Sequence, residues 1–305
     1  MEEALVRHLV AVALALPALV LAWYAPARGQ LNLYRKMTPQ ALPSGADIEH
    51  FDVGSVAGQI STHPWEWDAL FMFLVAAVVV GLVLAAGRLS PVLGLLVGLP
   101  IAGAGLTAQL FPDTSRAIAE YPPANGAGEM GLGDSDLGAR LLLDGGVYLL
   151  LGAALTAGAL TALRARPVRT LRWWAGIPVG LVGLVVAWGL FLGAVPLGDV
   201  AGALLLTAAG VVLGYLASSR RLPRTAALVA GLPILMLGVR EILHMTGELW
   251  LADLLFPLDL TSSSTTLLLR DALLGGGGGF TLMGGALVVA ALAPWRRAPG
   301  LRPVG

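Results

Sequence analysis

Two short stretches contain residue types that can move protons or bind a ligand. The first runs His63-Pro64-Trp65-Glu66-Trp67-Asp68, and the second begins at Arg240-Glu241 and reaches His244. If the second stretch is helical, Glu241, His244 and Glu248 share one face, because they are three and four residues apart. A histidine beside carboxylates can exchange protons near neutral pH, since its unperturbed pKa is about 6.5. These stretches are the candidate functional site.

Three interpretations of this site stay open. In the first, Trp65 and Trp67 anchor the chain at a membrane surface, and Arg240 pairs with Glu241 or with a carboxylate of a neighbouring helix. In the second, the stretches bind a quinone headgroup: a histidine donates to a carbonyl, a carboxylate takes the proton, and aromatic rings stack on the ring. The residues assigned to this quinone pocket are His63, Glu66, Trp67, Asp68, Glu241 and His244.

The third interpretation is a metal site, because each stretch has a carboxylate three residues from a histidine. Di-metal helical bundles use that spacing, with more glutamates. Its ligands would be His63, Glu66, Glu241 and His244.

The composition indicates which elements must position these residues. Of 305 residues, 57% are hydrophobic and 12% are charged, whereas soluble domains are about 25% charged. A helix needs about 20 apolar residues to cross a bilayer, and eight stretches approach that length: Leu5–Trp23, Ala69–Ala86, Val92–Phe111, Leu141–Leu163, Trp173–Val195, Val200–Ala217, Ala226–Val239 and Phe280–Leu292. The sequence predicts an all-α integral membrane protein, a bundle of about eight transmembrane helices in the plasma membrane.

The arginines predict the orientation of the spans. With the N-terminus inside, the inner segments hold most of the 19 cations and only two acids, Glu2 and Glu3. A bias of Lys and Arg toward the cytoplasm sets orientation, so both termini are expected to be cytoplasmic. An alternative is that the first span is a signal peptide cleaved near Ala25-Pro26-Ala27, but the two acids are unfavourable for a basic leader.

The predicted organisation is two four-helix halves. Residues 1–163 hold the first four spans, with a long outer loop over 26–67. Residues 164–172 form an arginine-rich cytoplasmic link. Residues 173–305 hold the other four spans, with an outer amphipathic segment over 241–279. Comparing the halves by eye reveals no convincing residue-level repeat. Pairs such as Gly94 and Gly98 predict close helix packing.

A further polar pair stands at the start of the fourth span. Arg140 and Asp144 are four residues apart and can pair on a helix, either as a structural ion pair or as part of an outer polar cavity. His50, in the first outer loop, is expected to face water.

Several functions are excluded or weakened by what the chain lacks. It has no cysteine, so it holds no Fe–S cluster through thiolates. The spans lack the facing histidine pairs of a di-haem cytochrome, and balanced charge offers no basic surface for nucleic acid. A proton-coupled carrier usually places acids near the midplane, and none is found there.

The eight spans in two halves, the cytoplasmic termini and the outer polar cluster resemble the haem-free membrane-anchor subunits of the polysulfide and dimethyl sulfoxide reductase family. The stretch from Trp65 through the second span, and then Arg88 to Asp113, is the part most similar to that family's opening helices. The resemblance implies an eight-helix subunit that exchanges electrons between quinone and an Fe–S partner docked on the outer face. The first helix and its long loop depart from that pattern.

Two other classes of function stay open. One is a permease or lipid-pathway component with a cavity built by helix packing, and the other is a structural or assembly subunit without chemistry. Bound quinone would favour the anchor, vectorial solute uptake the permease, and neither the structural subunit.

Overall fold

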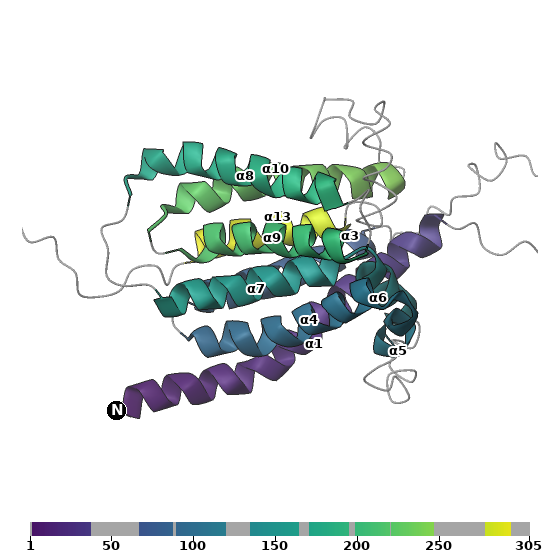
Figure 1. Cartoon of the computed structure of the whole chain (residues 1–305), viewed down its shortest axis with the longest axis horizontal. Helices are drawn as coiled ribbons and strands as arrows, with labels where there is room; N and C mark the ends of the chain where they lie inside the picture. Colours follow the sequence, from purple (N-terminus) through teal and green to yellow (C-terminus); the bar gives the residue numbers. More distant parts are fainter. Residues whose placement is uncertain are drawn as a thin grey trace, which may run out of the picture.

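The computed structural model describes residues 2–37, 67–87, 90–119, 135–164, 171–194, 199–219, 221–246 and 278–293. Within these ranges every regular element is helical. The elements are α1 (Glu2–Met37), α3 (Asp68–Ala86), α4 (Pro91–Leu110), η2 (Pro112–Thr114), α5 (Ser115–Ala119), α6 (Ser135–Asp144), α7 (Val147–Arg164), η4 (Trp173–Ala175), α8 (Gly176–Ala194), α9 (Asp199–Ser218), α10 (Arg224–Thr246) and α13 (Gly278–Leu292). The long helices lie side by side in a bundle (Figure 1).

Seven of the described helices are long and apolar enough to cross a membrane. The eighth apolar helix, α13, has 15 residues, which is about 22 Å of helix. It is buried along nearly its whole length, with α10 and α3 as its main neighbours. The prediction of an all-α, multi-pass membrane bundle is confirmed. The orientation stays a prediction, and the end of the bundle where α1 ends and α3 begins is named the outer end after it.

The first helix is longer than the sequence predicts. α1 continues through Pro26 to Met37, so the part of the predicted loop that covers residues 26–37 is helical. Pro26 has no N–H to donate to the Ala22 carbonyl four residues back. The next carbonyl, that of Trp23, accepts from the Tyr148 hydroxyl at 2.6 Å, which ties α7 to α1 beside the proline. The proposed cleavage site lies inside this helix, with Ala25 and Ala27 buried.

The predicted fourth span is two helices rather than one. α6 ends at Asp144, and Gly146 adopts the left-handed region at φ 70° before α7 begins. Glycine is favoured at such a helix end because it has no Cβ to clash. The two-glycine turn therefore gives α6, a helix packed on α1 and α5, a direction of its own.

The two halves pair their helices in the same way. α4 packs on α7 in the first half as α10 packs on α13 in the second, and α1 contacts α3 and α4 as α8 contacts α9 and α10. The contacts between the halves match too, since α7 packs on α9 and α13 packs on α3. Exchanging α1, α3, α4 and α7 for α8, α9, α10 and α13 therefore preserves the main helix contacts, as expected for a two-fold axis along the bundle.

When the helices of the two halves are matched, a sequence repeat becomes visible that the sequence pattern alone did not indicate. Gly98-Leu99-Pro100-Ile101 on α4 recurs 133 positions later as Gly231-Leu232-Pro233-Ile234 on α10 (98 to 231). The same spacing relates further identical residues along the two halves: Ala76 and Ala209, Gly81 and Gly214, Arg88 and Arg221, Gly105 and Gly238, Gly145 and Gly278, Gly146 and Gly279, Leu149 and Leu282, Gly152 and Gly285. The spacing is 165 positions for α1 and α8 (23 to 188), where Leu19-Val20-Leu21-Ala22-Trp23 matches Leu184-Val185-Val186-Ala187-Trp188 at four of five residues.

Equivalent glycines make equivalent close contacts. A Cβ placed on Gly98 would lie 2.8 Å from the Leu155 Cβ of α7, and one on Gly231 would lie 2.6 Å from the Leu287 Cβ of α13. Small residues let helix backbones approach this closely. Gly189 differs, because no atom lies within 4 Å of its would-be Cβ.

Candidate functional site

The outer end of α10 holds a buried ion pair. Arg240 Nη1 donates to Glu241 Oε1 at 3.1 Å, and the two side chains are only 3% and 9% exposed. Arg240 has interactions beyond this one. The predicted pairing is therefore confirmed, but at a buried position instead of a membrane surface. Burying a charge costs several kcal/mol even when it is paired. Stability of the fold therefore does not explain why this ion pair is present.

The other predicted site residues are only partly described. Trp67 precedes α3 and is exposed, and Asp68 is the first residue of α3 and is half-buried. Neither is bonded to Glu241 among the described residues. His244 belongs to α10, but its side chain lies outside the described part, and His50, His63 and Glu66 lie outside the described residues. Within the described ranges no three His, Asp or Glu side chains gather as metal ligands.

Three aromatic rings from α8 and α13 meet in the second half, and they are not among the residues that the sequence pattern indicated. Trp188 on α8 stacks on Phe280 of α13 at 5.3 Å between ring centroids, and Phe191 lies 6.0 Å from Trp188 and 5.4 Å from Phe280. They border an apolar pocket of about 30 Å³, whose remaining lining includes Leu150, Leu184, Leu213, Ile234 and Met283. Aromatic pairs at these distances attract each other beyond simple burial.

Helix register places the rings level with the ion pair. α10 and α13 run in opposite directions, and Leu235 lies against Gly284, so Phe280 is about level with residue 239. Along the α8 contact, Gly180 lies against Ala226 and Val229, which puts Phe191 at a similar height. At 1.5 Å per residue, both rings are within about one helical turn of Glu241.

The same place in the first half is filled. Trp23, the counterpart of Trp188, stacks on Tyr148 with centroids 4.3 Å apart and planes 7° apart. Tyr148 is fully buried. At the counterpart of Tyr148 the second half has Thr281, and the ring contact comes from Phe280 instead. Among the described residues, the second half therefore combines an aromatic pocket with a buried charge pair, whereas the Arg140–Asp144 pair of the first half is about half exposed.

The first half has a polar cavity at the outer end instead. A partly open cavity of about 460 Å³ lies between α4, η2, α5 and α6, and its lining residues are Ala108, Gln109, Pro112, Asp113, Ser115, Arg116, Arg140 and Asp144. Arg140 Nε lies 3.6 Å from Asp144 Oδ2, and the side chains are 49% and 44% exposed. Both predicted alternatives hold, since the residues pair and also line a polar cavity.

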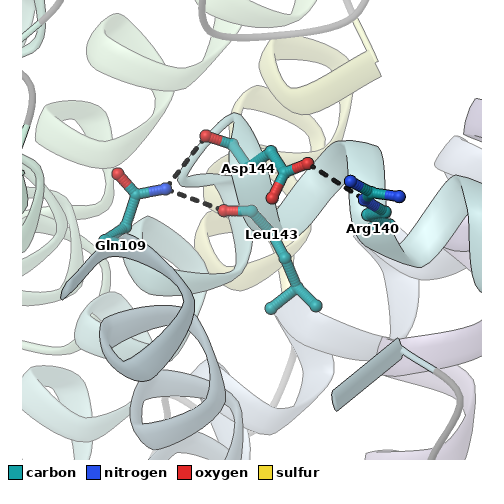
Figure 2. Close-up of polar contacts among 4 residues, drawn as sticks. All are labelled: Gln109, Arg140, Leu143 and Asp144. Carbon is teal, nitrogen blue, oxygen red and sulfur yellow. Dashed lines mark hydrogen bonds and ion pairs between the residues drawn. The ribbon is translucent and has the colours of Figure 1, made fainter. Parts of the chain in front are cut away.

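Gln109 supports this cavity by bonding the end of α6. Its Nε2 donates to the carbonyls of Leu143 at 2.8 Å and Asp144 at 3.0 Å, as Figure 2 shows. Because α6 stops at the glycine turn, its last carbonyls need partners from outside the helix, and the Leu143 carbonyl also accepts from the Gly146 N–H at 3.0 Å. The α4 side chain thus fixes the helix break, and with it the positions of Arg140 and Asp144.

The fold defines the class of the protein: a multi-pass, all-α membrane protein built from two repeats of a four-helix unit. Comparisons with protein families, with curated proteins and with solved structures find no match for the chain. The resemblance to the reductase anchor subunits accordingly stays a prediction.

The sequence contained signals for the sites that were missed. Trp188 recurs in the same five-residue pattern as Trp23, and Phe280 follows the glycine pair that matches Gly145 and Gly146. Finding the repeat would have placed these aromatic residues together. The Gln109 contact had no such signal, because it depends on where α6 ends.

Proposed function

We propose that the chain is the membrane-anchor subunit of a respiratory oxidoreductase of the plasma membrane, and that it exchanges electrons with quinone near the outer end of its second half. The observation that carries the proposal is the buried Arg240–Glu241 pair within a membrane span, at about the same height in the bundle as the aromatic rings. An ionisable residue within a membrane span marks a functional site by default. The aromatic rings at the same height favour a flat, apolar ring as its ligand.

The proposed ring position lies between the aromatic residues and the ion pair. The pocket of about 30 Å³ is far smaller than the roughly 300 to 1,000 Å³ of sites that hold small molecules, so the ring enters only when Trp188 and Phe280 move apart. Trp188 is half-buried, which leaves it free on one side to turn. A quinone tail then follows the apolar, bilayer-facing surface of α8, which exposes Val182 and Val185.

The chemistry is a two-electron oxidation. A quinol gives up two electrons and two protons to become a quinone. The Glu241 carboxylate accepts the first proton, and the second passes to water at the outer end. Arg240 donates to the ring oxygen and stabilises the negative charge that develops there. The electrons pass to a redox centre of a partner subunit docked at the outer end, because this chain has no cysteine for an Fe–S cluster. The predicted ligands His63 and His244 remain part of this proposal.

The test is purification of the tagged chain from its native membranes in mild detergent. Mass spectrometry then identifies the co-purifying subunits and the extractable quinone in the same sample. We expect an Fe–S or molybdenum-enzyme subunit and about one quinone per chain. A single chain without quinone would refute the proposal and favour transport or a structural role.

A pair of matched variants locates the ligand. We expect Trp188→Leu to lose most of the bound quinone, because it removes a wall of the pocket. Trp23→Leu alters the counterpart position, which Tyr148 closes, and should retain quinone. Equal quinone loss in both variants would place the ligand elsewhere.

A further inference from the structure

We propose that the polar cavity of the first half binds a zwitterionic group, namely a phosphate joined to an ammonium, as in the headgroup of phosphatidylethanolamine. The site is independent of the proposed quinone site. It lies between α4, α5 and α6, whereas the aromatic pocket lies between α7, α8, α9, α10 and α13.

The size and composition of the cavity fit such a ligand. Its volume of about 460 Å³ falls in the range of small-molecule sites, about 300 to 1,000 Å³. It is lined by two cations, Arg116 and Arg140, and two anions, Asp113 and Asp144. A purely anionic ligand would face repulsion from both carboxylates, and a purely cationic one from both guanidinium groups. A ligand with one charge of each sign satisfies both sets.

The ion pair in the cavity is loose enough to exchange partners. Arg140 and Asp144 are separated by 3.6 Å and are about half exposed, beyond the 2.7–2.9 Å of a strong charge-assisted hydrogen bond. Exposed pairs of this kind contribute little to folding. The guanidinium can therefore turn to a phosphate, which it binds through two parallel N–H groups, while the carboxylate accepts from an ammonium.

The scaffold of the cavity is fixed although its ion pair is loose. Gln109 holds the end of α6 through two backbone carbonyls, and Ser115 at the start of α5 is buried. Preorganised walls reduce the entropy that binding would otherwise cost.

The surroundings of the cavity suit a lipid as the source of the headgroup. Phe111 directly precedes the lining residue Pro112 and is 61% exposed, and Leu137 lies one turn before Arg140 and is also exposed. Exposed apolar side chains beside a charged cavity at the outer end of a membrane bundle are placed to contact acyl chains.

The second half has no such site by sequence. At the repeat spacing of 133 positions, the counterparts of Gln109, Arg140 and Asp144 are Ile242, Leu273 and Gly277. The cavity residues are thus an addition to one repeat only, rather than a consequence of the shared fold.

The test measures lipid retention by native mass spectrometry. The purified full chain in detergent receives equal amounts of dioleoyl phosphatidylethanolamine and dioleoyl phosphatidylglycerol, with and without free phosphoethanolamine. We expect preferential retention of phosphatidylethanolamine, and about a tenfold loss in each of Arg140→Gln and Asp144→Asn, as for a lost charge-assisted hydrogen bond. Arg172→Gln, an exposed cation at the other end of the bundle, is the control and should retain the lipid.

The outcomes separate the sources of the ligand. Retention of phosphatidylethanolamine that free phosphoethanolamine does not displace supports a lipid headgroup site. Displacement by free phosphoethanolamine supports the same site with a soluble zwitterion as its ligand. Equal retention of both lipids, or unchanged retention in the two cavity variants while all proteins keep the same melting temperature, would overturn the proposal.

Discussion

The two repeats share one helix arrangement but place their charges differently. In the first half Arg140 and Asp144 are 3.6 Å apart and about half exposed, whereas in the second half Arg240 and Glu241 are 3.1 Å apart and buried. The aromatic positions differ as well. In the first half the ring of Tyr148 fills the space beside Trp23, whereas in the second half a pocket remains beside Trp188. Because the packing glycines are shared and the polar groups are not, the repeat accounts for the fold and the differences between halves for the sites.

The largest expected effect is the loss of one partner of the buried pair. Arg240→Met leaves the Glu241 carboxylate buried without its cation, and we expect a loss of about 3–5 kcal/mol in stability. Thermal unfolding in detergent measures it. The double variant Arg240→Met with Glu241→Leu should recover most of the loss, because no uncompensated charge remains. A double variant as unstable as the single one would show that the pair stabilises the fold.

Overpacking the shared helix contacts should affect both halves equally. Gly98→Leu and Gly231→Leu each push a side chain into the facing helix, and we expect each to lose about 3 kcal/mol. Gly189→Leu is the matched control, since its side chain would meet open space. Thermal unfolding of the three variants tests whether the repeats are equivalent; a large difference between the first two would break the comparison.

Removing the Gln109 amide should affect the first half only. Gln109→Leu leaves the carbonyls of Leu143 and Asp144 without this donor, and we expect a loss of about 2 kcal/mol. The counterpart change, Ile242→Leu, conserves volume and should cost less. Hydrogen exchange of the α6 amides gives a local readout, and unchanged exchange in Gln109→Leu would contradict the assigned contact.

The smallest expected effect is at the exposed pair. Arg140→Gln should lower stability by about 1 kcal/mol or less, because water screens charges that are half exposed. The stability losses of Arg140→Gln and Arg240→Met, measured in the same buffer, compare the exposed pair directly with the buried pair. Similar losses would mean that burial does not separate the two pairs.

Much of the fold could be predicted from the sequence, because membrane spans are recognised by the length and hydropathy of their apolar stretches. The limits of α1 could not, since Pro26 is a common helix breaker that this helix accommodates with Tyr148 nearby. The break between α6 and α7 was missed because Leu141 to Leu163 is apolar apart from Asp144 and a few uncharged polar residues, and the left-handed conformation of Gly146 is not evident from that pattern.

The candidate site was predictable in part. The Arg240–Glu241 and Arg140–Asp144 pairs follow from sequence proximity, but their different burial depends on which helices surround them. The ring cluster joins α8 to α13, residues about 90 positions apart by number (188 to 280), and such contacts follow from helix packing rather than from local pattern.

The central claim is that Arg240 and Glu241 are retained for a ligand rather than for folding. The most direct test measures quinone content in the double variant Arg240→Met with Glu241→Leu, purified alongside the unaltered protein from native membranes. The account predicts about one quinone per chain in the unaltered protein, and little or none in a double variant that melts at a similar temperature. Equal quinone in both proteins, or none in the unaltered one, would contradict it.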